Sequence, residues 1–287
     1  MKKLIIIIAI FFECICFSKR ITLASFNVER LGESKKDYVS LAKIVSKFDI
    51  IALEEVMNTD GLDKLLKHLN NYSYIISKPV GSKKYKEHYA ILYKKNVVDK
   101  IENIGVYNDK NNDFIREPSA FYVKTNKLDM LLIPVHSIFG KNESERVYEA
   151  TKYIDVYNYF YNKTKQDDII LLGDFNLPAN DKAFNRLKRK YNLENIINPI
   201  EDKTTLSKKG LASSYDNIFI NISKLKAFTN RYGVYNFTMN NYEKIRKYIS
   251  DHLLIFIELE NERDWYEKYI QKNFNNSYTS CLWKYDF

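Results

Sequence analysis

Apolar residues recur along the chain with two different spacings, and each spacing predicts a different kind of element. Continuous or alternating apolar runs predict β-strands over residues 21–27, 49–56, 72–76, 88–93, 97–107, 119–124, 128–135, 168–172, 215–220 and 253–260. Apolar residues at every third or fourth position predict helices over residues 35–47, 62–69, 143–161 and 183–190. The chain is therefore expected to form an α/β fold with more strands than helices.

The order of these elements is irregular, because several strands follow one another before a helix intervenes. This order favours packed sheets with helices outside them over a barrel of regular strand–helix units. The chain has 287 residues, 45% of them hydrophobic, and no linker or repeat divides it. We therefore expect residues 19–260 to form one large domain.

The first 18 residues differ from this domain in composition. Two lysines precede an unbroken apolar run over residues 4–12, which is too short to span a membrane and is typical of a secretory signal peptide. Cleavage is expected after Ser18, with the protein secreted or held in the periplasm or at the cell surface. A lipid anchor on Cys14 or Cys16 is the weaker alternative, because larger residues precede both cysteines.

The last 27 residues, 261–287, follow the final expected strand and are rich in aromatic side chains. They predict a C-terminal extension, a helix and tail packed on the domain. No segment besides residues 1–18 is apolar enough to suggest stable membrane insertion. Once a signal peptide is removed, Cys281 is the single remaining cysteine, so no internal disulfide is expected.

Basic residues outnumber acidic ones, with 45 Lys and Arg against 36 Asp and Glu, which gives a net charge of +9. A positive charge of this size favours binding to a polyanion such as nucleic acid. Much of the lysine is spread evenly along the chain, however, and a lysine-rich surface alone would give the same total. Charge therefore supports a nucleic-acid partner without establishing one.

Several polar side chains stand where an apolar strand ends. Glu55 closes the strand 49–56, and a carboxylate there suits a hard cation such as Mg²⁺, although taken alone it fits a solvated acid better. In the run Gly173-Asp174-Phe175-Asn176, Asp174 and Asn176 would face the same way if the chain stays extended, and a turn through Pro178 after the strand is the alternative. Asp174 can bind a metal or hold water, and Asn176 can donate to a phosphate oxygen.

The chain has four histidines, at positions 68, 88, 136 and 252. His68 is expected on a helix surface, and His88 suits a structural role. The other two stand at strand ends beside acids, where general acid–base chemistry is as reasonable as a structural role. A carboxylate on each ring would fix its tautomer and raise its pKa.

The carboxylates that suit this role are Glu87 for His136 and Asp216 for His252. Their positions belong to a longer series of short motifs: Phe26-Asn27, Glu55-Val56, Tyr85-Lys86-Glu87, Arg116-Glu117-Pro118, Val135-His136, Gly173-Asp174-Phe175-Asn176, Tyr215-Asp216 and Ser250-Asp251-His252. In sequence and order these motifs resemble the endonuclease/exonuclease/phosphatase superfamily, and within it the deoxyribonuclease I-like secreted nucleases. The resemblance extends from residue 21 to about residue 260.

The resemblance implies a four-layer α/β/β/α sandwich with two central mixed, mainly antiparallel sheets. It implies that Glu55 and Asn27, with Asp251 close by, hold a divalent cation. Mg²⁺ is the expected ion, and Mn²⁺ or Ca²⁺ are expected to substitute or assist.

The resemblance also implies a role for each remaining motif. His252, oriented by Asp216, would take a proton from the attacking water, and His136, paired with Glu87, would protonate the leaving 3′ oxygen. The products would carry 5′-phosphate and 3′-hydroxyl ends. The groups expected to position water, metal and phosphate are Asp174 and Asn176. Those expected to contact the nucleic acid are Tyr85, Arg116 and Asn176.

Two features depart from the pattern that this family carries. Met57 stands where an arginine often follows the metal-binding glutamate and valine, which weakens any inference of minor-groove insertion. Residues 177–178 and 213–214 contain no cysteine, so the stabilising disulfide and calcium sites of the family cannot be carried over.

These observations predict a secreted, metal-dependent endonuclease of low sequence specificity that acts on DNA, with RNA as an open second substrate. Three alternatives remain. One is a phosphodiesterase of the same fold acting on a lipid, such as a sphingomyelinase or phosphoinositide phosphatase. No apolar membrane-binding hairpin stands out in residues 21–260 for this role, although the aromatic residues of 261–287 could serve. The others are a toxin subunit that retains nuclease activity and a non-catalytic binding protein, which would be expected to have lost at least one of these residues.

Overall fold

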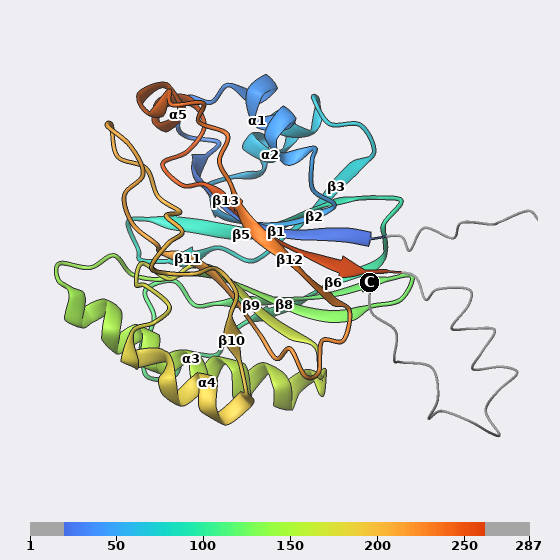
Figure 1. Cartoon of the computed structure of the whole chain (residues 1–287), viewed down its shortest axis with the longest axis vertical. Helices are drawn as coiled ribbons and strands as arrows, with labels where there is room; N and C mark the ends of the chain where they lie inside the picture. The colour runs from blue at the N-terminus through green and yellow to red at the C-terminus, as the bar shows by residue number, and fades with distance from the viewer. Residues whose placement is uncertain (1–19, 262–287) are drawn as a thin grey trace, which may run out of the picture.

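The structure is a computed structural model, and it describes residues 20–261. Two β-sheets lie face to face in the middle of the molecule, with helices on both outer surfaces (Figure 1). The four-layer α/β/β/α sandwich expected from the sequence is therefore confirmed. The predicted signal peptide and nearly all of the predicted C-terminal extension lie outside the described residues.

The first sheet has seven strands, in the order β12-β13-β1-β2-β5-β3 with β4 paired to β5. Their bounds are β1 (Arg20–Leu31), β2 (Ile50–Val56), β3 (Tyr72–Ile76), β4 (Val80–Gly81), β5 (Lys86–Lys94), β12 (Phe228–Tyr235) and β13 (Leu254–Glu260). Only β1 and β2 run parallel, and every other pairing in this sheet is antiparallel.

The second sheet has six strands, in the order β10-β11-β9-β8-β7-β6. Their bounds are β6 (Val98–Val106), β7 (Ser119–Thr125), β8 (Asp129–His136), β9 (Ile169–Asp174), β10 (Glu194–Asn195) and β11 (Asp216–Ile220). Its central strands β8 and β9 are parallel, and its other pairings are antiparallel. Both sheets are thus mixed and mainly antiparallel, as expected.

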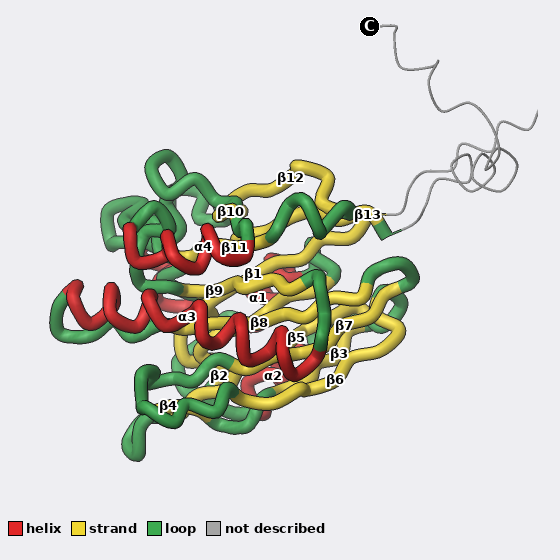
Figure 2. The backbone as a smooth tube through the Cα atoms, turned by 90° about the horizontal axis from the view of Figure 1, so that it is seen from below, coloured by secondary structure: helices red, strands yellow, loops and turns green. Residues whose placement is uncertain are grey.

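The helices form the two outer layers: α1 (Tyr38–Val45), α2 (Thr59–Leu66) and α5 (Tyr242–Tyr248) on the first sheet, and α3 (Glu143–Thr164) and α4 (Asn185–Tyr191) on the second, with a 3₁₀ turn over Lys182–Phe184. Figure 2 looks onto the second sheet, with α3 and α4 lying over its outer face. Within residues 20–261, none of the helices combines the length and apolar character needed to cross a bilayer.

The sequences of the central strands are continuous apolar runs because both faces of these strands are buried. In β1, Leu23 belongs to the core between the sheets, whereas Phe26 belongs to the core beneath α1 and α2. In β9, Leu172 faces the other sheet and Leu171 faces α3. This double burial makes the strand ends rigid supports for the polar residues that follow them.

Several elements differ from their predicted bounds or escaped prediction. The helices α1 and α2 begin at caps, where Asp37 accepts from the N–H of Ser40 and Asn58 accepts from that of Gly61, and neither cap follows from apolar spacing. Strand β12 and helix α5 were not predicted, because β12 is a half-exposed edge strand and α5 buries no residue completely. The two-residue strands β4 and β10 carry too little pattern to be recognised.

Candidate active site at the meeting edge of the two sheets

Three polar contacts link the two sheets at one edge of the sandwich. Glu87 of β5 reaches His136 at the end of β8, and Asn27 of β1 reaches Asp174 at the end of β9. In the third, Asp216 at the start of β11 contacts His252, just before β13. Each contact joins a residue of the first sheet, or its flank, to one of the second. The sequence-predicted residues therefore meet in one region, although they come from positions far apart in the chain.

The first carboxylate–imidazole pair is Glu87 with His136. Oε1 of Glu87 lies 2.7 Å from Nδ1 of His136, and the Glu87 side chain has no exposed surface. Burial alone would raise the pKa of Glu87, but the facing His136 ring, together with Arg116, holds that pKa below its ordinary value. Burial likewise acts to lower the pKa of His136, and Glu87 outweighs it, so the pKa of the imidazole is raised.

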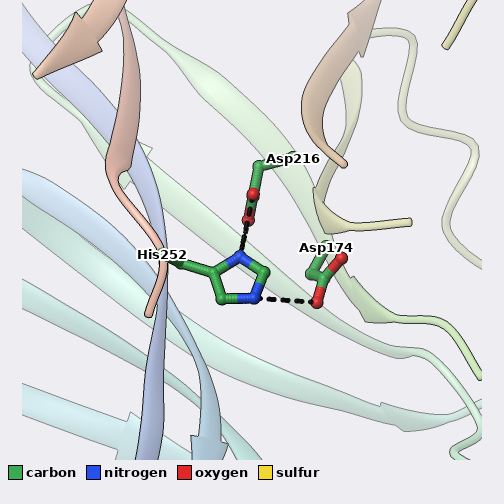
Figure 3. Close-up of side chains that lie close together, drawn as sticks. All are labelled: Asp174, Asp216 and His252. Carbon is green, nitrogen blue, oxygen red and sulfur yellow. Dashed lines mark hydrogen bonds and ion pairs between the residues drawn. The ribbon is translucent and has the colours of Figure 1, made fainter. Parts of the chain in front are cut away.

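The second pair is Asp216 with His252 (Figure 3), and both side chains are buried. Nδ1 of His252 lies 2.9 and 3.1 Å from the two carboxylate oxygens of Asp216. Burial opposes the charged ring, but Asp216 and Asp174 outweigh it and hold the pKa of His252 well above its ordinary value. The carboxylate also fixes Nε2 as the free ring nitrogen that faces the site.

Asp174 lies between the two imidazoles. Its Oδ2 atom is 3.6 Å from Nε2 of His252 and 3.8 Å from Nε2 of His136, and it accepts a hydrogen bond from Nδ2 of Asn27 at 3.3 Å. Nε2 of both rings therefore faces the same carboxylate oxygen. Asp174, Asp216 and His252 also offer ligand atoms within 4.8 Å of one another, so this buried cluster is able to hold a metal ion.

Glu55 reaches the site through a break in regular strand geometry. Its backbone is left-handed, with φ +56°, where the register between β2 and β5 shifts. Its neighbour Glu54 remains buried against Ser25. Glu55 turns toward Asn27 instead, and Nδ2 of Asn27 donates to Oε1 of Glu55 at 3.1 Å. The backbone N–H of Arg30 donates to its other oxygen at 3.1 Å. Oε1 of Glu55 is 3.7 Å from Nε2 of His136.

Two more carboxylates stand on the Glu55 side of the site. Asp251 is about one-third exposed, and its Oδ1 lies 4.0 Å from Nε2 of His252. Burial and the nearby charges of Asp251 and Glu55 raise the pKa of Glu29, despite the opposing charge of Lys36. The other two acids thus repel Glu29, although Lys36 lies 3.6 Å from Glu29 and Arg246 lies 3.9 Å from Asp251. The three carboxylates outnumber these two cations, and such a group of oxygen atoms suits a hard divalent cation.

Asn27 uses both ends of its side-chain amide to hold neighbouring groups of the site in place. Its amide nitrogen bridges Glu55 and Asp174, while its amide oxygen accepts from the backbone N–H of Glu29 at 3.0 Å. Both Glu29 and Arg30 have left-handed backbones, at φ +45° and +55°, where the pairing of β1 with β2 is interrupted. This local strain turns the chain so that Asn27 holds Glu55 beside Asp174.

The chain does not stay extended from Asp174 to Asn176, and of the two arrangements open from the sequence it adopts the turn after the strand. The backbone of Asn176 is left-handed, with φ +48°, and its N–H donates to Oδ1 of Asp174 at 2.8 Å, which forms a tight turn. Its side chain donates to the backbone oxygen of Ser137 at 2.8 Å instead of aligning with Asp174. The turn still keeps Asn176 at the site, buried next to the loop that follows His136.

Arg116 and Tyr85 lie on the His136 side. Arg116 donates to the backbone oxygens of His136 and Ser137, and its Nη2 lies 3.1 Å from Nε2 of His136. The hydroxyl of Tyr85 donates to the sulfur of Met57 at 3.6 Å, and Arg30 lies over the Tyr85 ring at 5.2 Å. A cation therefore stands beside Tyr85 even though position 57 is not an arginine.

The sequence reasoning missed the residues that support these groups. The hydroxyl of Thr204 accepts from the backbone N–H groups of both Tyr215 and Asp216. The hydroxyl of Ser250 donates to the backbone oxygen of Asn27 at 2.6 Å and accepts from the N–H of His252. Single serines and threonines carry no sequence signal of this kind, although Ser250 stands inside a recognised motif.

The two remaining histidines stay outside the site. His68 is exposed at the end of α2, and Nδ1 of His88 contacts the backbone oxygen of Ser77 at 2.8 Å. Within residues 20–261, the imidazoles of the site are therefore those of His136 and His252.

The fold and the site define a class of protein: an α/β/β/α sandwich with two buried carboxylate–imidazole pairs around an aspartate at one sheet edge. The chain belongs to the Endonuclease/Exonuclease/phosphatase family, whose family model matches residues 24–252.

Curated relatives place the chain near the deoxyribonucleases of this family. A deoxyribonuclease of Thioalkalivibrio sp. (strain K90mix) is 29% identical over 212 residues, which cover 69% of this chain and 57% of that protein. Deoxyribonuclease gamma of Rattus norvegicus is 29% identical over 271 residues, which cover 84% of this chain and 85% of that protein. The chain thus spans less than two thirds of the bacterial relative.

Solved structures agree with the fold. An endonuclease/exonuclease/phosphatase family protein from Bacteroides thetaiotaomicron matches with a TM-score of 0.58 and 18% identity, covering 84% of this chain and 95% of that one. A mannosyl-6-phosphatase from the same species matches with a TM-score of 0.57 and 20% identity, covering 83% and 99%. Nucleases and phosphatases share this fold, so the function has to be argued from the site.

Proposed function

We propose that this protein is a secreted endonuclease that hydrolyses phosphodiester bonds of DNA with low sequence specificity and requires a divalent metal. The observation that carries the proposal is the position of Asp174 between two oriented imidazoles, with His252 Nε2 at 3.6 Å and His136 Nε2 at 3.8 Å. Hydrolysis of a phosphodiester needs one group to accept a proton and another to donate one, on either side of the phosphorus. The two rings meet this need.

The proton transfers can be assigned from the two pairs. Water attacks phosphorus, and Nε2 of His252 takes its proton, while Asp216 stabilises the imidazolium that forms. The bond from phosphorus to the 3′ oxygen breaks, and the leaving oxygen takes a proton from Nε2 of His136. The products carry 5′-phosphate and 3′-hydroxyl ends. Exchange with solvent then removes the proton from His252 and returns a proton to His136.

Arg116 is proposed to link phosphate binding to the readiness of His136. An arginine nitrogen always donates, so the 3.1 Å contact to Nε2 favours the neutral ring, with its proton on the Nδ1 that faces Glu87. A phosphate in the site competes for the guanidinium, which matches its oxygens by a fork of donors. As Arg116 turns to the phosphate, Nε2 becomes free to carry the proton that the leaving group needs.

The residues fit a hard divalent cation. Glu55 and Asp251 supply carboxylate oxygens, Glu29 adds negative charge, and Asn27 holds Glu55 in place. Mg²⁺ is the cation we propose, with Mn²⁺ or Ca²⁺ as substitutes. Such a cation would supply charge stabilisation for the transition state. Asp174 and Asn176 would position water and phosphate, and Tyr85 would contact the strand.

The buried cluster of Asp174, Asp216 and His252 offers a second place for the cation, and the two assignments are mutually exclusive for His252. A ring nitrogen that binds a metal cannot accept a proton from water. Because Asp216 already engages Nδ1, only Nε2 is available for either role. We favour proton transfer, because the more exposed Glu55 and Asp251 leave the buried pair intact.

A parallel substrate assay tests the proposal. The purified mature protein is given plasmid DNA, RNA, sphingomyelin vesicles and a phosphoinositide, each across a series of Mg²⁺, Mn²⁺ and Ca²⁺ concentrations. We expect nicked plasmid with Mg²⁺, no product with EDTA, and 5′-phosphate ends. Turnover of either lipid without any cleavage of DNA would reject the nuclease assignment. Detection of the processed protein outside the expressing cell tests secretion.

A further inference from the structure

A second cationic position lies next to the candidate active site, at Arg146 in the first turns of α3. Its guanidinium carbon is 5.0 Å from the centre of the Phe139 ring and 5.9 Å from that of Tyr215. Its Nη1 donates to the Tyr215 hydroxyl at 3.4 Å. The Nε atom, by contrast, is buried and has no hydrogen-bond partner. Buried donors are rarely left unpaired, so this atom calls for an explanation.

Arg146 lines a cavity of about 280 Å³. Lys203 and Tyr215 stand on its wall, together with the hydroxyl-bearing Ser213 and one acid, Glu143. The two cations outnumber the acid, so the cavity favours an anion. Its size is close to the lower limit for pockets that bind small ligands, which is enough for a phosphate with part of its sugar.

Asn176 connects this cavity with the active site. It lines the cavity, and its side chain donates to the backbone oxygen of Ser137, which also accepts from Arg116 at 2.9 Å. Tyr215, on another wall, directly precedes the Asp216 that orients His252. A substrate chain that passes through the active site would therefore enter this cavity with its neighbouring unit.

Phe139 supplies an apolar surface at the same place. This residue is 59% exposed even though its ring contacts Arg146, which is unusual for a phenylalanine. Exposed aromatic rings beside cations are the common means of holding single nucleotides, because every base has a face that can stack.

We propose that this cavity is a subsite for the phosphate adjacent to the scissile one in a polynucleotide strand. Lys203 and a reoriented Arg146 bind its oxygens, so that the buried Nε of Arg146 becomes accessible and gains the partner it lacks, and Phe139 stacks on a neighbouring base. The inference rests on the proposed nuclease function, since it assigns a second unit of the same substrate. It makes the enzyme more efficient on chains than on isolated diesters.

The test compares two substrates that differ in length. Bis(4-nitrophenyl) phosphate has a single phosphate and reaches only the active site, whereas a single-stranded DNA of about twelve nucleotides also fills the subsite. Arg146→Ala is expected to lower kcat/KM on the oligonucleotide by about tenfold or more, because it removes charged hydrogen bonds, and to change kcat/KM on the small diester by less than about twofold. Arg189→Ala, which removes the same charge from an exposed position on α4, serves as the matched control and is expected to change neither.

Equal losses of kcat/KM on both substrates would mean that Arg146 only supports the active site. No loss on either substrate would mean that the cavity does not bind the oligonucleotide. Both results overturn the subsite. If Arg146→Ala does not fold, Phe139→Ala tests the subsite instead, because Phe139 is exposed and its removal should leave the fold intact. The same selective loss of kcat/KM on the oligonucleotide is expected. A wild-type protein that cleaves no DNA at all would reject the proposed function itself, which is a separate outcome.

Discussion

The carboxylate of Glu87 and the imidazole of His136 join the two sheets by a buried 2.7 Å hydrogen bond. Because the carboxylate stabilises the charged ring, it raises the pKa of His136 against the opposing effect of burial. In the proposed mechanism, the pair therefore sets the pH above which His136 loses the proton that it would give to the leaving group.

Glu87→Gln is expected to lower the pKa of His136, so the alkaline limit of the pH profile of kcat/KM should move to lower pH. His136→Ala should remove the acid altogether and reduce kcat by about 10² to 10⁴-fold. A pH profile of plasmid nicking measures both effects. His88→Ala is the control, since its ring bonds to the Ser77 backbone oxygen and lies outside the site. An unchanged alkaline limit in Glu87→Gln would contradict the assignment.

Asp216→Asn separates the two roles open to His252. Removing the carboxylate should lower the pKa of His252, and because a base acts in its neutral form, the acidic limit of activity should move to lower pH. The value of kcat should also fall by about 10² to 10⁴-fold as the ring loses its fixed tautomer. If His252 instead binds the cation, the main change would be a higher Mg²⁺ requirement with an unmoved acidic limit. Steady-state kinetics across pH and Mg²⁺ concentration distinguish the two.

Glu55→Gln tests the cation site. The amide keeps the size of the side chain and loses its charge, so the Mg²⁺ concentration for half-maximal activity should rise by about tenfold or more. Glu33→Gln removes the same charge from an exposed residue close in sequence and is expected to leave this concentration unchanged. Calorimetric titration of Mg²⁺ into both variants checks binding without reference to turnover. Equal binding by both would place the cation elsewhere.

Many of the strands and helices could be predicted from apolar spacing, because the central strands are buried on both faces and α3 has an apolar stripe. The pairing of Glu87 with His136 and of Asp216 with His252 also followed from residue types at strand ends. The left-handed backbones of Glu29, Arg30 and Glu55 could not be predicted, since none is a glycine and their strain is sustained by contacts from distant parts of the chain. The turn at Asn176 was one of the two arrangements left open by the sequence, because asparagine adopts a left-handed backbone more readily than most residues. The sequences of strand β12 and helix α5 show no clear apolar pattern, because these elements bury few side chains.

Glu149 on α3 is expected to make stability depend on pH. Burial raises the pKa of its carboxyl from 4.5 to about 7, although the Ile138 N–H and Arg116 favour the charged form. A raised folded-state pKa means that the folded protein binds more protons than the unfolded chain between these values. Its contribution, up to about 3 kcal/mol, is thus complete below pH 4.5 and is lost as the pH rises through 7.

The corresponding measurement is the free energy of unfolding in urea at several pH values. Glu149→Gln should flatten the decline of stability between pH 5 and about pH 7. Glu243→Gln, on the exposed face of α5, should leave the decline as it is in the wild type. Parallel curves for the wild type and Glu149→Gln would contradict the raised pKa.

Gly173 should tolerate no side chain. A Cβ atom there would lie 2.1 Å from the backbone oxygen of Val135, and the φ of +140° is one that other residues rarely adopt. Gly173→Ala is expected to destabilise the protein by about 3 kcal/mol or more, because β8 and β9 would have to separate. Gly210→Ala, where no atom lies within 4 Å of the added carbon, should be close to neutral. Urea unfolding of the two variants gives the comparison.

The polar contacts that join the sheets have a practical consequence for dividing the chain. Opening the backbone in the turn between β5 and β6, at Lys95 and Asn96, would leave Asn27, Glu55 and Glu87 in one fragment. His136 and Asp174 would remain in the other, so neither fragment would hold a complete set of groups for turnover. If each fragment were fused to one of two proteins that bind each other, their binding would bring the fragments together and restore cleavage. The fold is therefore suited to a complementation reporter.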